Sequence, residues 1–446
     1  MSAARTRISS DQVHRFDLGG GSLGLLEPSH DVPLVSIVVA LRCGSAADPS
    51  DKSGLARIAM RMLRRGCEGL NSEQIDFNID ALGAEVAVDT STATVGVHAQ
   101  VIARNLDAFI ELLARMLRSP TFPEHEVERL KRESIAEIVD ARDNDRVVAQ
   151  KAMQRTLFDG HPYGRSSGGT SRTVAAIERS DVVDFYRRYV VRANVVVGMA
   201  GDVSAERATV LAKRLVADLP AGEAAADFVP EPSVRAGRHL LVVDKPERTQ
   251  TQILVGTLGT SPHDADHAAL FVSTAVFGGT FTSRLMREIR SKRGWSYGAS
   301  ARASIDRKRQ GWILWTFPAA ADAAPCLKLS IALLELWVEG GITSSEAGFI
   351  KRYLVRSHAF EVDTAAKRLH QALDVELLAL PQDYYSGWIE RVRSVTPEAA
   401  SAAVRERIHP RDLIAVVVGT ASEILEPVRD AVPGLAETTV VPFDAE

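Results

Sequence analysis

Cysteine is scarce in this chain, which has only Cys43, Cys67 and Cys326 among its 446 residues. An odd number of cysteines without CxxC spacing supports neither a disulfide framework nor a zinc ribbon. We therefore expect all three cysteines to be buried as small apolar side chains. Residues 1–12 are polar and hold no apolar run of a signal peptide, so we predict a cytoplasmic protein.

Other features that mark particular classes of protein are missing as well. Aromatic residues make up 6% of the chain and the net charge is −4, so no nucleic-acid-binding surface is expected. No stretch approaches the roughly 18 uninterrupted apolar residues of a membrane-spanning helix. With 46% hydrophobic and 25% charged residues, the composition is that of a folded globular protein. A length of 446 residues predicts more than one domain.

One segment, 219–237, divides the chain into two parts of similar length. It reads LPAGEAAADFVPEPSVRAG, with three prolines, two glycines and no apolar periodicity, a composition typical of a linker. We therefore predict an N-terminal domain at 1–218 and a C-terminal domain at 238–446.

The two parts present similar elements in the same order. Each opens on an apolar, β-branched run that predicts a buried strand, and continues with an alternating strand pair, two amphipathic helices and a final strand. This order predicts a tandem duplication with an α+β fold, in which each α/β sandwich is a mixed, mainly antiparallel sheet with helices packed on one face. The alternative is two unrelated α/β domains. The matching segments are 34–41 and 251–258, 84–97 and 300–317, 106–117 and 326–337, 122–132 and 342–352, and 194–201 and 413–419.

The stretch 51–67, DKSGLARIAMRMLRRGC, predicts an amphipathic helix that Ser53 can cap and Gly66 can end. It resembles the first helix of the M16 (pitrilysin-like) metallopeptidases, the family of mitochondrial processing peptidase and of the core proteins of the cytochrome bc1 complex. In catalytic members this helix carries HxxEH, in which two histidines bind zinc and the glutamate is the general base. The matching positions here are Arg57, Met60 and Arg61.

These replacements remove the chemistry of the motif. Arginine has no lone pair to give a metal, and methionine cannot take a proton from water, so we expect no zinc site in this chain. The third zinc ligand of the family is a later glutamate, which matches Glu137, 76 residues after Arg61. Two interpretations of Glu137 stay open, a carboxylate paired with Arg57 or Arg61 and a residual metal ligand; we favour the ion pair.

Segment 277–297, FGGTFTSRLMREIRSKRGWSY, provides a second resemblance. M16 chains of the non-zinc type carry an Arg-x6-Tyr pair here, which matches Arg290 and Tyr297. The resemblance implies that both side chains reach the active site of a zinc-bearing partner and donate hydrogen bonds to the substrate and its tetrahedral intermediate. The alternative is an exposed helix arginine and a half-buried core tyrosine. Gly278 and Gly279 resemble a shortened glycine-rich loop, or form a simple turn.

Two further segments support the resemblance, and a third resembles a metal-binding motif. Segments 157–165 and 181–189 resemble the loop and the aromatic helix that M16 proteins carry after the helical region. His263 and His267, with two acids between them, suggest either a metal site or the start of a helix; we expect the helix start.

The resemblance covers nearly the whole chain and implies the LuxS/MPP-like metallohydrolase fold. The predicted function is that of the non-catalytic, zinc-lacking subunit of a heterodimeric M16 zinc endopeptidase that degrades unfolded peptides. Such a chain is inactive alone, binds no cofactor itself, and works with a partner subunit that has an intact HxxEH motif and holds the zinc. The alternatives are a structural protein of the core-protein type and a free-standing, peptide-binding homodimer.

Overall fold

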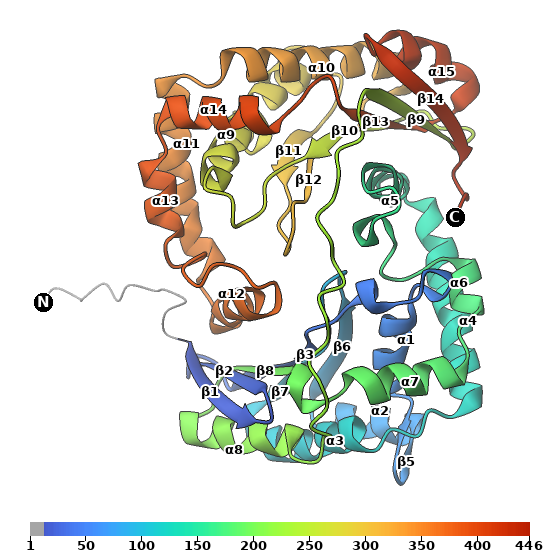
Figure 1. Cartoon of the computed structure of the whole chain (residues 1–446), viewed down its shortest axis with the longest axis vertical. Coiled ribbons are helices and arrows are strands. Elements are labelled where there is room, and N and C mark those ends of the chain that lie inside the picture. Colours follow the sequence, from blue (N-terminus) through green and yellow to red (C-terminus); the bar gives the residue numbers. More distant parts are fainter. Residues whose placement is uncertain (1–12) are drawn as a thin grey trace, which may run out of the picture. The chain divides into compact units, whose positions relative to one another are not determined.

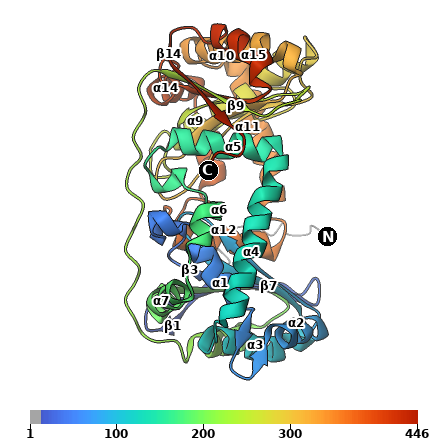
Figure 2. The same ribbon diagram turned by 90° about the vertical axis from the view of Figure 1, so that its right-hand side faces the viewer.

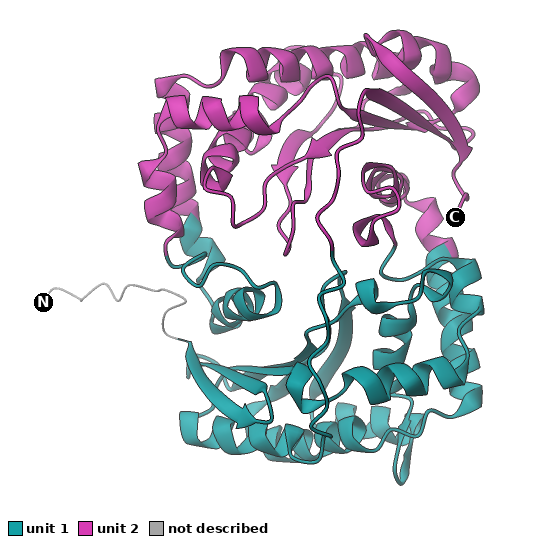
Figure 3. Cartoon of the chain, in the orientation of Figure 1, with its two compact units in different colours: residues 1–138, 166–229, 358–386 teal, residues 139–165, 230–357, 387–446 magenta. Residues whose placement is uncertain are grey.

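The computed structural model describes residues 13–446, so the prediction made on residues 1–12 lies outside the described part. These residues form two compact units, each built around one six-stranded sheet (Figure 3). Each unit takes one segment from the other side of residues 219–237: residues 358–386 belong to unit 1, and residues 139–165 belong to unit 2. The duplication of a domain of about 220 residues stays a prediction. Within the described residues, unit 1 comprises 13–138, 166–229 and 358–386, and unit 2 comprises 139–165, 230–357 and 387–446.

The sheet of unit 1 has the strand order β1-β2-β8-β3-β7-β6 (Figure 1). All neighbouring strands are antiparallel except β2 and β8, which are parallel. The strands predicted at 34–41 and within 84–97 are confirmed as β3, β6 and β7. The bounds are β1 (His14–Gly19), β2 (Ser22–Pro28), β3 (Leu34–Leu41), β6 (Ala84–Thr90), β7 (Val95–Ile102) and β8 (Val195–Gly201).

The sheet of unit 2 has the order β11-β12-β10-β13-β9-β14, which matches that of unit 1 in five of six strands. The sixth strand differs, because β1 is antiparallel to β2 whereas β14 is parallel to β9. The predicted α+β fold with two mixed, mainly antiparallel sheets is confirmed. The bounds are β9 (Arg238–Asp244), β10 (Gln252–Leu258), β11 (Ala299–Ala303), β12 (Gly311–Thr316), β13 (Ile414–Gly419) and β14 (Leu435–Pro442).

Most helices of each unit cover one face of its sheet, as predicted, and share a continuous apolar core with it. In unit 1 these are α1 (Leu55–Met62), α2 (Ser72–Ala81), α3 (Leu106–Arg118), α4 (Glu124–Asp140, whose last residues belong to unit 2), α6 (Ser171–Ala175), α7 (Arg179–Tyr189) and α8 (Ala205–Val216). In unit 2 they are α9 (His267–Gly278), α10 (Ala323–Gly340), α11 (Ser344–Ser357), α13 (Trp388–Ser394), α14 (Pro397–Arg407) and α15 (Ala421–Asp430).

One helix in unit 1, α12 (Ala365–Leu377), packs on the second face of the sheet. All seven residues of β8 are buried, so its side chains need apolar cover on both faces. Leu369 and Leu373 of α12 supply this cover, and burying each contributes about 1.5–3 kcal/mol. Gly198 in β8 allows the close approach, because a Cβ there would lie 3.1 Å from Leu373 and 3.2 Å from Leu369.

A buried ion pair fixes α12 in unit 1. The Arg368 Nε atom donates to Glu27 Oε1 at 2.6 Å, and the Glu27 side chain, at the end of β2, is only 3% exposed. Arg368 also donates to the carbonyl oxygen of Val362, so its charge is satisfied where water has little access. Leaving one charge of such a pair unpaired in the interior is costly.

Unit 2 shows the corresponding arrangement with α5 (Asp145–Leu157), which packs on the second face of its sheet against β10 and β13. Lys245, buried at the end of β9, donates to the Asp145 carboxylate at 2.6 Å and to the carbonyl oxygens of Arg142 and Asp143. In both units, a buried charge at the end of a matching strand thus holds the helix that covers the second face.

The segment 220–236 has neither helix nor strand and runs extended (Figure 2). All three cysteines are free and buried, as predicted. Among the helices within residues 13–446, none combines the length and the apolar character needed to cross a membrane.

We predict that Glu27→Gln lowers the free energy of unfolding by about 3 kcal/mol, because Arg368 is left buried without a counter-charge. The measurement is urea unfolding followed by far-UV circular dichroism. Asp107→Asn is the matched control, since it breaks an exposed ion pair with Arg207 in the same unit and should cost at most about 1 kcal/mol. Equal losses in both variants would show that the buried pair does not hold α12.

Candidate functional site

Helix α1, which carries the degenerate zinc motif, begins differently from the prediction. Gly54, with φ of 101°, takes the N-cap position. The Asp48 carboxylate accepts hydrogen bonds from the backbone N–H groups of Gly54 and Ala56, at 2.8 and 2.9 Å. Ser53 is therefore not the cap, and Gly66 lies in the short strand β4 (Gly66–Cys67) rather than at the helix end. A carboxylate six residues before the N-cap thus accepts from the N–H groups at the start of the helix.

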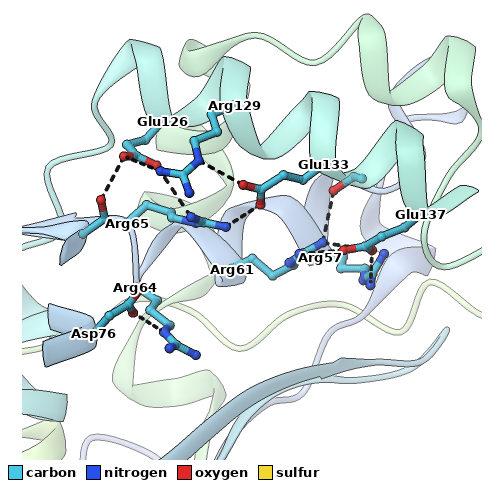
Figure 4. A network of polar contacts seen from close by, with 11 residues as sticks. Arg57, Arg61, Arg64, Arg65, Asp76, Glu126, Arg129, Glu133 and Glu137 are labelled. Atoms are coloured by element: carbon cyan, nitrogen blue, oxygen red, sulfur yellow. Dashed lines mark hydrogen bonds and ion pairs between the residues drawn. The ribbon is translucent and has the colours of Figure 1, made fainter. Parts of the chain in front are cut away.

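The arginines at the motif positions converge on Glu137, which α4 presents to α1 (Figure 4). Arg61 binds both carboxylate oxygens, with its Nη2 atom 2.9 Å from Oε1 and its Nη1 atom 3.2 Å from Oε2. Arg57 donates from Nη2 to Oε2 at 2.9 Å. The predicted ion pair is confirmed, and Glu137 pairs with both arginines rather than with one. Met60, the third motif position, is buried in the core.

The electrostatics of this cluster keep Glu137 ionised. Partial burial would raise the pKa of the Glu137 carboxyl, but the hydrogen bonds and charges of Arg61 and Arg57 outweigh burial and lower that pKa overall. Each arginine side chain is partly exposed, at 30% for Arg57 and 20% for Arg61. The cluster thus links α1 to α4 by charge-assisted hydrogen bonds at the positions where zinc members bind their metal.

The donor set at these positions does not fit zinc. Zinc requires histidine nitrogen, thiolate or carboxylate ligands, and two guanidinium groups occupy the only carboxylate. Within residues 13–446, no group of three or more His, Cys, Asp or Glu side chains is arranged to hold a metal ion. The site of this chain therefore offers hydrogen-bond donors and positive charge instead of a Lewis acid.

In unit 2, Arg290 lies on a π-helical turn, η8 (Met286–Ser291). The bond from the Lys292 N–H to the Arg287 carbonyl, at 3.0 Å, spans the five residues that define this geometry. Met286 and Ile289 point into the core, so the turn is anchored on its inner side. Short π-helical turns are rare and occur frequently at functional sites. Nothing in the sequence pattern predicts this turn.

The Arg290 guanidinium lies over the ring of Tyr297, with its carbon atom 4.4 Å from the ring centroid. Tyr297 is 75% exposed, and nearby Phe281 is 77% exposed, with its ring centroid 5.7 Å from the same guanidinium. The alternative of a half-buried core tyrosine is therefore wrong. Within the described part of the chain, neither the Arg290 guanidinium nor the Tyr297 hydroxyl has a hydrogen-bond partner.

The segments around this pair are held rigidly. Ser296, buried next to Tyr297, donates to the Gly298 carbonyl at 2.8 Å and accepts from the Phe317 N–H. Arg284, just before η8, binds the Glu346 carboxylate through Nε at 2.8 Å and Nη2 at 2.7 Å. These hydrogen bonds from Arg284, together with that of the Thr343 N–H, lower the pKa of Glu346 to about 2 against the opposing effect of burial. The two donors therefore project from a fixed framework.

The other candidates of the second half have structural roles. His267 is the first residue of α9; it is buried, its Nδ1 atom lies 2.8 Å from Thr260 Oγ1, and burial lowers its pKa to about 4. The neighbouring Asp266 pairs with Arg407, so the histidine-acid segment forms a helix start as expected. Gly278 ends α9 against the backbone of Ala301, where a Cβ would lie only 2.3 Å from the amide nitrogen.

We predict that the triple variant Arg57→His/Met60→Glu/Arg61→His binds one zinc ion per chain. The expectation follows from the geometry, since positions 57 and 61 already reach Glu137 at hydrogen-bond distance. Equilibrium dialysis with metal analysis measures the binding. Adding Glu137→Gln should lower the zinc affinity by about tenfold or more, because even the loss of a residue that only hydrogen-bonds to a metal ligand lowers the affinity by that factor. Equal zinc affinity with and without Glu137→Gln would show that residues 57, 61 and 137 do not form a common zinc site.

We also predict that Glu346 contributes to the stability of the fold and that this contribution is lost in acid. Its pKa is about 2 in the folded chain against an ordinary value of 4.5, so its stabilising effect is present above 4.5 and lost as the pH falls toward 2. We expect the free energy of unfolding of Glu346→Gln, measured by urea unfolding at a series of pH values, to vary less between pH 4.5 and pH 2 than that of the unchanged chain. The control is Glu390→Gln, whose exposed side chain pairs with Arg393 in the same unit and which should leave the dependence unchanged. Parallel curves for all three proteins would contradict the assignment.

Comparisons with known proteins agree with this geometry. The profile "Insulinase (Peptidase family M16)" matches residues 25–171 and "Peptidase M16 inactive domain" matches residues 176–354. The "Non-peptidase homolog YmxG" of Helicobacter pylori is 21% identical, over 88% of this chain and 91% of that protein. The crystal structure of a peptidase M16 inactive domain from Pseudomonas fluorescens superimposes with a TM-score of 0.83 at 23% identity, covering 91% of this chain and 98% of that one.

A further similar structure is that of the periplasmic protease PqqL from Escherichia coli, with a TM-score of 0.79 and 16% identity. The match covers 97% of this chain but only 51% of PqqL, so this chain corresponds in size to one half of that protease. The matched profiles, the fold and the arginines that replace the zinc-binding residues lead to one conclusion: the chain belongs to peptidase family M16, as a member of its inactive type.

Proposed function

We propose that this chain is the non-catalytic subunit of a two-chain M16 zinc endopeptidase that degrades unfolded peptides. In this function the partner subunit has an intact HxxEH motif and holds the zinc, which supplies the hydrolytic chemistry. This chain contributes Arg290, Tyr297 and half of the peptide chamber. A location in the cytoplasm is part of the proposal and agrees with three free, buried thiols.

The observation that carries the proposal is the pair of unused donors in unit 2. A guanidinium stacked on an exposed tyrosine, with neither group hydrogen-bonded to the described residues, is poorly explained as a structural element. Exposed aromatic surface and an unpaired cation are instead suited to a ligand. The Arg290 guanidinium would donate to the carbonyl oxygen of the scissile bond, and the Tyr297 hydroxyl would stabilise the negative charge that develops there.

The need for a partner follows from what unit 1 contains. Arg57 and Arg61 with Glu137 form an ion pair, and the buried Met60 has no basic group for activating water. PqqL supports a two-part enzyme by analogy, because that periplasmic protease is about twice as long as this chain. A peptide would bind as an added strand along an exposed sheet edge, since β6 and β11 are edge strands of their sheets.

The name of YmxG, a non-peptidase homolog, favours a second candidate, a structural or interaction protein without a role in proteolysis. The two functions differ in what they require of Tyr297. A structural role does not depend on the hydroxyl of an exposed side chain that has no hydrogen-bond partner in the described part of the chain, whereas the proposed catalytic contribution does.

We predict that Tyr297→Phe and Arg290→Gln each lower kcat by about a hundredfold or more when the chain is mixed with an M16 subunit that has HxxEH. The reason is the loss of one donor to the developing oxyanion. Cleavage of an internally quenched peptide measures the rate. Arg287→Gln is the matched control, because this exposed arginine lies on the same π-helical turn but does not contact the Tyr297 ring.

Each chain alone serves as the baseline, and this chain alone should show no zinc-dependent cleavage. Robust cleavage by the purified chain without a partner would overturn the proposed division of labour. Full activity of the mixture containing Tyr297→Phe would favour the structural role.

A further inference from the structure

A cavity of about 460 Å³ lies in unit 1 beside the degenerate zinc motif. Its floor is apolar, formed by buried side chains such as Met60, Val97 and Met116. Four arginines lie along its walls, and the edge strand β6 borders it through residues 86–88. The four wall arginines are Arg57, Arg61, Arg64 and Arg65.

The charge on the cavity walls is unbalanced. Asp76 is the only acidic residue among the lining residues, because the carboxylates that pair with Arg57, Arg61 and Arg65 come from α4 (Figure 4). Glu137 pairs with both Arg57 and Arg61, whereas Arg65 contacts two carboxylates, so the excess of positive charge lies at the Glu137 end of the cluster. Guanidinium groups in a partly enclosed site attract anions and bind carboxylates through paired N–H donors.

The edge strand adds a second recognition element. The Arg64 Nη1 atom donates to the Val86 carbonyl oxygen at 3.2 Å, while its Nε atom binds Asp76. Val86 has its sheet partner, Ala99, on the opposite side in β7, so this carbonyl accepts from the open side of the edge strand. An incoming strand could donate to Val86 in place of Arg64, whose Nη1 would then be available to an anion.

We propose that this cavity binds the carboxylate of an extended peptide whose backbone pairs with β6. The apolar floor receives the aliphatic part of the residue that bears the carboxylate, and Arg57 and Arg64 bind its oxygens. The carboxylate belongs either to the C-terminus of the peptide or to an acidic side chain. This inference rests on the proposed peptide-binding function, and it assigns to unit 1 an anchoring role distinct from that of Arg290 and Tyr297.

The test uses the full-length chain and three dansylated peptides of equal length and otherwise identical sequence. The first ends in an amide and has no acidic residue, the second ends in a free carboxylate, and the third ends in an amide but contains one glutamate. Fluorescence anisotropy measures the dissociation constants. We expect the second or the third peptide to bind about tenfold or more tightly than the first, and the comparison of these two identifies the source of the carboxylate.

The variants that test the arginines are Arg57→Gln and Arg64→Gln. Arg57→Gln leaves Glu137 paired with Arg61, so the link between α1 and α4 stays intact. Each variant should remove most of the preference for the carboxylate while leaving the affinity for the neutral peptide unchanged. Arg118→Gln is the matched control, because its guanidinium forms an exposed ion pair with Asp218 elsewhere in unit 1 and should keep the preference.

The outcomes separate this inference from the proposed function. Equal affinity for all three peptides, or an equal loss of preference in Arg118→Gln, would overturn the carboxylate site and leave the peptide-binding function in place. Binding of inorganic phosphate as tight as that of the acidic peptides would overturn the assignment to a peptide. Absence of binding for every peptide would overturn this inference, whereas cleavage of the neutral peptide by the reconstituted pair tests the proposed function independently.

Discussion

The central strands of both sheets are apolar on two faces, and this constraint governs the arrangement of the chain. A strand such as β8, buried along its whole length, cannot leave one face in water. The helices next to each sheet in the sequence cover the first face, so the second face takes α12 in unit 1 and α5 in unit 2. The buried charges of Glu27 and Lys245 then hold these helices at one position on their sheets. Each half of the sequence thus supplies the helix that covers the second face of the sheet built by the other half.

The same physical logic explains the altered motif. A zinc site joins α1 and α4 through a metal, whereas Arg57, Arg61 and Glu137 join them through charge-assisted hydrogen bonds. The replacement keeps the two helices connected but removes the reactive centre and adds positive charge beside an edge strand. These positions thereby lose the groups that would bind zinc and activate water. Arg290 and Tyr297 are the complementary case, since neither side-chain donor has a hydrogen-bond partner among residues 13–446.

Much of the fold was predictable because it depends on local pattern. The alternation and apolar runs that specify β3, β6 and β7 are written in adjacent residues, and the loss of zinc chemistry follows from the identities of Arg57 and Arg61. Among interactions between distant segments, the pairing of Glu137 with the motif arginines was predictable from the family resemblance, but others were not. Asp48 rather than Ser53 caps α1, the Arg284–Glu346 pair holds a π-helical turn, and α12 covers a sheet formed far from it in sequence. Each of these depends on tertiary packing, which no local periodicity encodes.

The interleaving also imposes an order on biosynthesis. Strand β8 is complete at Gly201, but the helix that covers its second face begins only at Ala365. A ribosome therefore exposes one apolar face of the first sheet while it translates most of the second half of the message. Unit 1 can therefore bury this face only after α12 has been made, which ties its maturation to translation of the second half.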